Sequence, residues 1–147
     1  SAVYADISWV GILDTRIPET VESVFATVVE ARELAVSFIG RTLAEGRSVS
    51  GQRVDREVRS FLERSGYAAA LRHRTGHSID REVHGFGANL DSVEFPDSRL
   101  LLEGSCFSVE PGLYLDNFGM RSEIDAYIWE GKPVVSGKQP QFELLHF

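Results

Sequence analysis

The sequence predicts an α+β fold in which two helices are followed by a series of short strands. Two observations carry this prediction. Apolar residues recur at helical spacing in two stretches before Gly66, and after Tyr67 this periodicity gives way to short apolar runs separated by Gly and Pro. Helices and strands that segregate along a chain indicate α+β rather than a doubly wound parallel sheet. The length of 147 residues, without an internal repeat or linker, is that of one domain, residues 1–147.

The first helix is predicted over 18–45, because Pro18 and the glutamates that follow it suit a helix start and Gly46 suits its end. The second is predicted over 50–65, and the charges on its far side, Asp55 among them, are expected to be solvated. Short alternating runs predict the strands, which are expected near 3–9, 70–75, 82–85, 105–110, 112–115, 119–129 and 141–146.

The alternation begins at once at the amino terminus. Val3, Ile7 and Trp9 fall on one side of the predicted first strand, and Tyr4 and Asp6 on the other. A chain that begins inside a strand is expected to be part of a longer one.

Composition excludes several classes of function. Fifteen Lys and Arg against 22 Asp and Glu give a net charge of −7, which disfavours partners such as nucleic acid or an anionic membrane. The single cysteine, Cys106, cannot form an internal disulfide, and its apolar surroundings predict a buried, unreactive thiol. No apolar run approaches the roughly 20 residues that span a bilayer. We therefore expect a cytoplasmic protein.

Three of the four histidines lie in one short window, as His73, His77 and His84. Thr75 and Gly76 favour extended structure there, so His73 and His77 are expected on one face, with His84 returning towards them beyond a turn. A shared site is one interpretation, and histidines in core hydrogen bonds or on the surface are the other.

Two carboxylates are expected to meet on neighbouring strands. Glu110 ends one strand before a Pro-Gly turn, and Glu123 shares a polar face with Arg121 on the next. Carboxylates buried together repel unless a cation or protons compensate. The alternative is a solvated face of an antiparallel sheet.

Asp6 is a single acidic residue in an apolar and aromatic strand, where Asp is disfavoured. An edge position would explain it, and so would metal binding. Together with one histidine and two glutamates it gives an oxygen-rich ligand set that suits Mn²⁺, Co²⁺, Fe²⁺ or Zn²⁺.

Three segments, in order, resemble the carboxyl-terminal part of the pita-bread metallopeptidases. They are His73-x3-His77-x6-His84, Ser108-Val109-Glu110-Pro111-Gly112-x-Tyr114 and Arg121-x-Glu123. The text is most similar to the Xaa-Pro aminopeptidase and prolidase branch of this superfamily, which also includes methionine aminopeptidase and creatinase. The resemblance covers essentially the whole chain and implies an incomplete copy of the pita-bread fold.

The resemblance implies a role for each matching residue. The metal ligands would be Asp6, His77, Glu110 and Glu123. His84 would bind substrate and steady the tetrahedral intermediate, His73 would assist proton transfer, and Tyr114 and Arg121 would position the substrate and Glu123. An intact enzyme would hold two divalent ions, with manganese favoured and cobalt, zinc or iron as alternatives.

The chain also departs from the family pattern. The family has two aspartate ligands, and nothing before Asp6 supplies the first of them. An alternative takes Asp6 as the first aspartate and Asp14 as the second, but the gap between them is too short. Asp6 is therefore preferred as the second aspartate. Ser78 stands where the family usually has a glycine after the ligand histidine, and Gly85 stands where prolidases usually have an acidic residue after the distal histidine. We therefore expect one weak ion position, little activity from these residues alone, and an apolar surface that an amino-terminal portion or another copy in a homo-oligomer would cover.

The implied activity is metal-dependent hydrolysis of the amino-terminal peptide bond of peptides, with Xaa-Pro favoured. A creatinase-like hydrolase that needs no metal and a non-catalytic binding protein of the same fold are the alternatives. Retention of both glutamates argues against the metal-free one.

Overall fold

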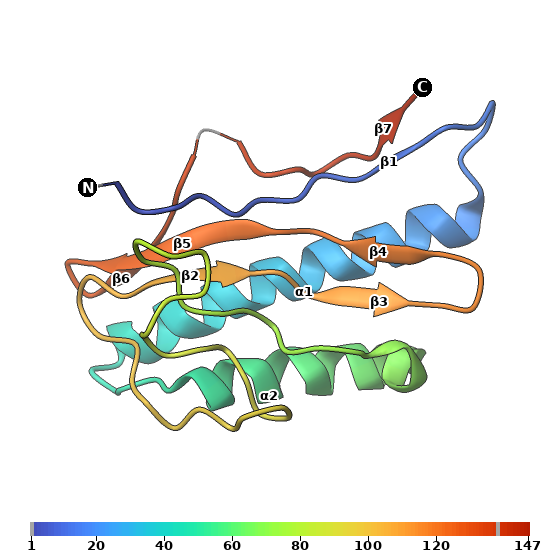
Figure 1. Ribbon diagram of the computed structural model, residues 1–147. Coiled ribbons are helices and arrows are strands. Elements are labelled where there is room, and N and C mark those ends of the chain that lie inside the picture. The colour runs from blue at the N-terminus through green and yellow to red at the C-terminus, as the bar shows by residue number, and fades with distance from the viewer. Residues whose placement is uncertain (1, 138) are drawn as a thin grey trace.

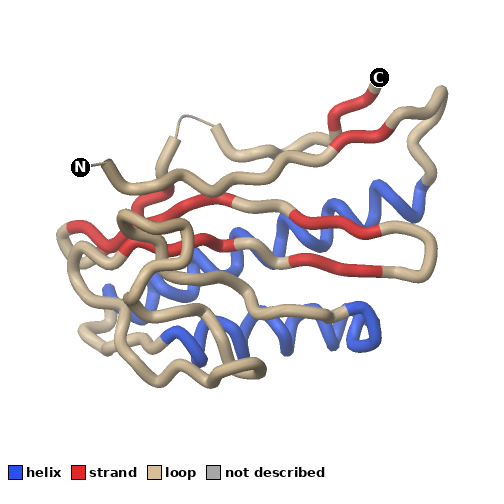
Figure 2. Tube along the Cα trace, viewed as in Figure 1, coloured by secondary structure: helices blue, strands red, loops and turns tan. Residues whose placement is uncertain are grey.

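The computed structural model describes residues 2–137 and 139–147, and it has the predicted α+β arrangement (Figure 1). The two long helices are α1 (Glu19–Ala44) and α2 (Gly51–Leu62), and α2 continues through a π-helical turn (Glu63–Tyr67) and a 3-10 turn (Ala68–Ala70). The strands are β1 (Gly11–Ile12), β2 (Cys106–Val109), β3 (Gly112–Tyr114), β4 (Gly119–Arg121), β5 (Ile124–Trp129), β6 (Lys132–Val135) and β7 (Leu145–His146). Figure 2 shows how much of the chain between the helices and β2 is loop. No helix among the described residues is long and apolar enough to cross a membrane.

The strands form three small sheets. An antiparallel sheet has the order β2-β5-β6, β3 pairs with β4 antiparallel, and β1 pairs with β7 in parallel. The strands predicted over 105–110, 112–115 and 119–129 are confirmed, with a break at 122–123, whereas β6 was not predicted.

Alternation along β2 and β5 separates the core from a polar face. Phe107 and Val109 of β2 and Ala126 of β5 are fully buried in the apolar cluster that α1 and α2 also line. Ser108 and Asp125 are opposite each other in the register and point to the other face. The helices therefore cover one face of the sheet and leave the polar side chains on the other.

The apolar stripes of both helices are buried as predicted. They comprise Val24, Val28, Ala31, Ala35 and Ile39 on α1 and Val54, Val58 and Leu62 on α2. The prediction for Asp55 is wrong, because this carboxylate is fully buried rather than solvated.

Two predicted strands are absent. Residues 70–75 leave a 3-10 turn and are irregular, and pairing with β2 begins only at Thr75, whose carbonyl accepts from Glu110. Residues 82–84 form bends and Gly85 is irregular, because Asp80 accepts hydrogen bonds from the backbone of Glu82 and Phe86. Side-chain hydrogen bonds of this kind stabilise a turn at the expense of strand pairing.

The amino-terminal segment is extended, as Figure 1 shows, but only Ser8 forms a β-bridge there, with Glu123. The prediction of a full strand over 3–9 is therefore wrong. Of the strand predicted over 141–146, only the last two residues form a strand, which is β7. Side chains do alternate between two faces here, but the apolar ones face outward and the polar ones inward, which is the reverse of a core strand. Ile7 and Trp9 are 61% and 48% exposed, whereas Asp6 and Ser8 are partly buried.

Gly51 lets α2 begin directly against the backbone of a loop. A Cβ at this position would lie 1.7 Å from the carbonyl oxygen of Asn89. At Gly40, inside α1, a Cβ would meet only Pro133, at 3.5 Å, which is ordinary contact.

We predict that Gly51→Ala lowers the free energy of unfolding by about 2 kcal/mol or more, because the loop must move to relieve the overlap. The matched variant Gly40→Ala should be neutral or stabilise the fold by up to about 1 kcal/mol through helix propensity. Urea unfolding of both variants measures the difference, and equal effects would contradict the close approach.

Candidate metal centre

The polar face of the sheet carries a pocket of about 330 Å³. The side chains that line it come from the amino-terminal segment, the histidine window, one loop and the ends of β2 and β4: Asp6, His73, Arg74, His77, His84, Glu94, Glu110, Arg121 and Glu123. Seven of the eight residues predicted for the site line this pocket. Tyr114 does not, but it contacts His73.

Strand register brings the two glutamates together. Val109 of β2 is opposite Ile124 of β5 in the antiparallel pair. Glu110 directly follows Val109 and Glu123 directly precedes Ile124, so both glutamates lie on the same side of the sheet. Glu123 is also held from the other side, because its N–H donates to the carbonyl of Ser8 at 3.3 Å and its carboxylate accepts from the Ser8 hydroxyl.

His77 lies beside β2 and is fixed by hydrogen bonds at both its backbone and its ring. Its N–H donates to the Ser108 hydroxyl at 3.0 Å, and its carbonyl accepts from the Ser108 N–H at 2.8 Å. The ring Nδ1 lies 3.1 Å from the carbonyl of Ser78. A carbonyl can only accept, so Nδ1 carries the proton and the lone pair of the neutral ring is on Nε2.

Two carboxylates converge on that lone pair. Nε2 of His77 lies 3.4 Å from Asp6 Oδ2 and 3.4 Å from Glu110 Oε1. Ligand atoms of Asp6, His77 and Glu123 lie within 4.8 Å of one another. Asp14, the alternative aspartate, lies in an exposed turn where it bonds its neighbour Thr15.

The spacing and the charge both fit a divalent cation. Two donors about 2.1 Å from one ion are roughly 3.0–3.4 Å apart at octahedral to tetrahedral angles, which matches the two His77 distances. Burial, and then the charges of Glu110 and Asp6, raise the pKa of Glu123 to about 7 against the opposing effects of Ser8 and Arg121. Bringing these carboxylates together is therefore unfavourable unless a cation or a proton compensates.

His73 and Tyr114 form a hydrogen-bonded pair beside the pocket. His73 Nδ1 lies 2.7 Å from the carbonyl of Arg74, so it donates there and leaves Nε2 to accept from the Tyr114 hydroxyl at 2.8 Å. Burial raises the pKa of Tyr114, which keeps the phenol protonated as a donor.

Arg121 and His84 each contact one of the converging residues. Arg121 Nη1 lies 3.2 Å from Glu110 Oε2, the oxygen that points away from His77. The His84 ring meets the His77 ring edge to face, with 4.4 Å between centroids. The turn after His77 therefore returns His84 to the site as the sequence predicted, while leaving it exposed to an incoming molecule.

Asp55 is a residue that sequence reasoning missed. From α2 its carboxylate accepts from the backbone and hydroxyl of both Thr75 and Ser92, and from Arg59. Arg59 in turn donates to the carbonyl of His73 at 2.7 Å. These bonds fix the histidine window and the loop after Asp91 to one helix. No periodicity signals them, because the helical pattern places Asp55 among solvated charges.

Asp125 belongs to the site's surroundings through a contact that no sequence pattern shows. It is buried, its Oδ2 accepts from the backbone N–H of Asp6 at 2.9 Å, and among the described residues its Oδ1 has no hydrogen-bond partner. Burial is the main cause that raises its pKa. Cys106, predicted to be buried, is half-buried, and burial likewise raises the pKa of its thiol.

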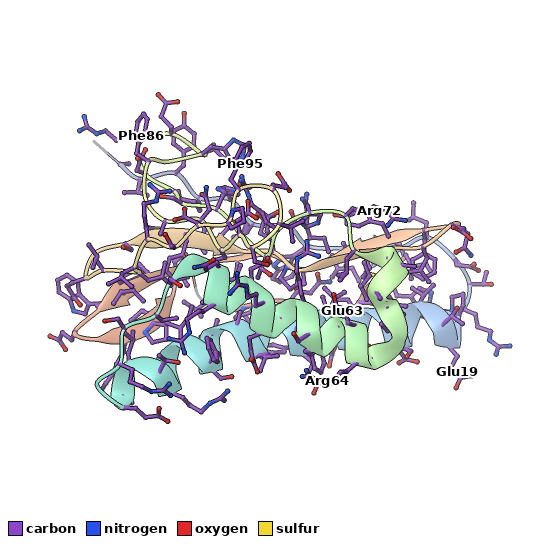
Figure 3. All side chains as sticks on the ribbon, turned by 90° about the horizontal axis from the view of Figure 1, so that it is seen from below. Glu19, Glu63, Arg64, Arg72, Phe86 and Phe95 are labelled. Carbon is purple, nitrogen blue, oxygen red and sulfur yellow. The ribbon has the colours of Figure 1, made fainter. Side chains whose placement is uncertain are left out.

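The loop that brings Glu94 to the pocket is held by two aspartates. Asp91 accepts from the backbone of Val93, Glu94 and Phe95. The carboxylate of Asp97 accepts hydrogen bonds from the backbone N–H of Arg99 and from its guanidinium. Figure 3 shows Phe95 and Phe86 on loops that project on the side of the sheet away from the helices, where they are 76% and 87% exposed.

Comparisons with known proteins show which family the chain resembles in sequence and fold. The sequence profile described as metallopeptidase family M24 matches residues 1–130. An Xaa-Pro dipeptidase of Lactobacillus helveticus is 34% identical over 76 residues, which are 51% of this chain and 20% of that protein. The chain therefore spans about a fifth of that curated relative.

Solved structures agree over almost the whole chain. The X-Pro aminopeptidase of Thermotoga maritima matches with a TM-score of 0.80 and 28% identity over 99% of this chain and 38% of its own. The Xaa-Pro dipeptidase of Bacillus anthracis matches with a TM-score of 0.84 and 25% identity over the same shares. The fold implied by the sequence motifs, an incomplete copy of a larger architecture, is confirmed.

The Asp97–Arg99 contact predicts a dependence of stability on pH. The hydrogen bond from Arg99 is the main cause that lowers the pKa of Asp97 from 3.8 to about 2. The ionised carboxylate therefore stabilises the folded state above about pH 4, and this contribution is lost as the pH falls towards 2. Because Arg99 is exposed, we expect a contribution of only about 1–2 kcal/mol.

Urea unfolding of wild type and Asp97→Asn at pH 5 and pH 2.5 measures this contribution. The variant should be less stable at pH 5, and the difference should shrink at pH 2.5. Asp116→Asn, at an exposed carboxylate, should show no such change. A difference for Asp97→Asn that is equal at both pH values would contradict the assignment.

Proposed function

The chain belongs to metallopeptidase family M24, and we propose that its polar pocket is the metal-binding part of a peptidase active site. The observation that carries the proposal is the convergence of carboxylates from separate segments on Nε2 of His77, at 3.4 Å each for Asp6 and Glu110. The proposed reaction is hydrolysis of the amino-terminal peptide bond of a peptide.

The proposed ligands are Asp6, His77, Glu110 and Glu123. Three carboxylates and one imidazole form a donor set suited to Mn²⁺, with Co²⁺, Zn²⁺ or Fe²⁺ as alternatives. A bound divalent ion would supply two effects, a lower pKa of the attacking water and polarisation of the substrate carbonyl. In an intact catalytic domain we propose two such ions, of which the second depends on ligands beyond these four.

In this proposal Glu110 would take the proton of the attacking water. One of its carboxylate oxygens faces His77 and the other faces Arg121, so its orientation is fixed from both sides. A positioned carboxylate within hydrogen-bond reach of a nucleophile is a general base. Arg121 would thereby position Glu110.

The other two histidines have separate tasks in the proposal. His84 is exposed at the pocket and would donate a hydrogen bond to the oxyanion that develops on the scissile carbonyl. His73 already accepts from Tyr114, which gives a two-residue path along which a proton can move at the edge of the pocket.

Xaa-Pro peptides are the substrates that we propose, since the relatives at 34% and 28% identity are described as an Xaa-Pro dipeptidase and an X-Pro aminopeptidase. A creatinase-like hydrolase without metal would have little use for Glu110 and Glu123 in one pocket. A non-catalytic binding protein of the same fold is distinguished by metal analysis.

Exposed apolar side chains line the amino-terminal segment, where Val3, Ile7 and Trp9 are 56%, 61% and 48% exposed. An amino-terminal portion of the domain, or a second copy in a homo-oligomer, remains our prediction for what covers them. Weak activity of residues 1–147 alone and a cytoplasmic location also remain predictions. Hydrolysis of an Xaa-Pro dipeptide at a rate typical of full-length relatives would contradict the first.

We predict that Mn²⁺ stabilises the chain and that the cluster is responsible. At a free concentration 100-fold above Kd the ion adds about 2.7 kcal/mol, which raises the thermal midpoint by roughly 5–10 °C. His77→Ala and Glu123→Gln should abolish the shift. Without metal, Glu123→Gln should be at least as stable as wild type, because one of several like charges is removed.

Differential scanning fluorimetry with and without Mn²⁺ makes the measurement, with metal content checked by elemental analysis. Glu63→Gln is the matched control, because Glu63 is exposed on the helical side of the molecule, away from the pocket (Figure 3). An equal shift in wild type and all variants, or none in wild type, would exclude the proposed ligands.

His84→Ala should separate catalysis from metal binding. We expect the complete gene product to lose at least about 100-fold in turnover of an Xaa-Pro dipeptide, because one oxyanion donor is removed. Its Mn²⁺ content should stay near the wild-type value, since His84 is not among the proposed ligands. Unchanged turnover, or loss of the metal, would refute this role.

A further inference from the structure

Arg32 is a fully buried cation in the middle of α1. Its guanidinium donates to two places that are distant in the sequence: Nη1 lies 2.7 Å from the Ser122 hydroxyl and 2.8 Å from the carbonyl of Gln141. Nε and Nη2 both donate to Glu33, and the group lies 4.9 Å from the ring centre of Phe142. A buried guanidinium is tolerated only when its donors are satisfied in fixed geometry, so these contacts hold the segments firmly.

One of these partners lies between β4 and β5, next to residues that line the pocket. Ser122 is fully buried and stands between Arg121 and Glu123, which both line the pocket. Alternate residues of extended chain point to opposite faces, so the bond that holds Ser122 against α1 also holds Glu123 towards the pocket.

The other partner leads to the amino-terminal segment. The side chain of Gln141 is buried and binds Val10 twice, accepting from its N–H at 2.8 Å and donating to its carbonyl at 2.6 Å. Val10 lies two residues after Ser8, whose hydroxyl donates to Glu123, and four after Asp6. Figure 1 shows the amino- and carboxyl-terminal segments running side by side there.

Asp6 and Glu123 therefore reach the pocket on two segments that share one anchor. We propose that Arg32 is a positioning residue for the metal centre, which sets the separation of the Asp6 and Glu123 carboxylates through Gln141 and Ser122. This inference rests on the proposed function, because it assumes that these carboxylates bind a divalent ion. It assigns a role in metal affinity to a side chain that does not line the pocket.

The test measures metal binding rather than turnover. Mn²⁺ affinity by isothermal titration calorimetry and the visible absorption spectrum of the Co²⁺-loaded protein are recorded for wild type, Ser122→Ala, Gln141→Met, their double variant and Arg32→Met. Arg41→Met is the control, because Arg41 lies on the same helix but is exposed, and within residues 2–137 and 139–147 its guanidinium bonds only Ser37 of that helix. Each protein is measured at a temperature where circular dichroism shows it fully folded.

We expect Ser122→Ala and Gln141→Met each to weaken Mn²⁺ binding about tenfold or more and to change the Co²⁺ spectrum, as loss of residues that orient ligands does. The double variant should lose less than the product of the two single effects, because both act on one separation. Arg41→Met should match wild type. Where Arg32→Met does not fold, the two milder variants decide.

Two failures are distinguishable. Folded variants of lower stability that keep the wild-type Kd and Co²⁺ spectrum would show that Arg32 only supports the fold, and would overturn the inference while leaving the proposed function intact. Absence of Mn²⁺ binding by wild type would overturn the proposed function and this inference with it.

Discussion

Repulsion among like charges is the constraint on which the rest of this structure depends. Asp6, Glu110 and Glu123 come from three segments to one pocket, and burial, followed by the charges of Glu110 and Asp6, raises the pKa of Glu123. The fold opposes the cost of this repulsion with contacts away from the pocket, namely strand register and backbone hydrogen bonds to Ser8 and Ser108. The same cost would favour binding of a divalent cation, because neutralising the cluster would relieve it.

Each helix contributes both an apolar stripe and one buried charge. The stripes make the core and determine which face of the sheet is left open. Asp55 of α2 then fixes the side of the pocket that carries His77, and Arg32 of α1 contacts the side that carries Glu123. Core packing alone would leave the polar face without a defined geometry, since apolar contacts are not directional.

Periodic features could be predicted from the sequence, and features made by individual side-chain hydrogen bonds could not. Alternation along 105–110 and 119–129 identified Glu110 and Glu123, and helical spacing identified both helices. The turns at 70–75 and 82–85 escaped, because Asp55 and Asp80 determine them through bonds to backbone groups. At the amino terminus the predicted alternation of side chains between two faces is observed. The inward face carries Asp6, because that face borders the pocket rather than the apolar core.

The attachment of Asp6 makes the outer edge of the molecule part of the metal centre. Hydrogen bonds at Asp6, Ser8 and Val10 hold the amino-terminal segment. The side chains of Ile7 and Trp9 face outward, while the carboxylate of Asp6 faces the pocket. A surface that docked on Ile7 and Trp9 would contact the same backbone that presents Asp6. By thermodynamic reciprocity, any factor by which such docking changed ion affinity would equal the factor by which the ion changed docking affinity.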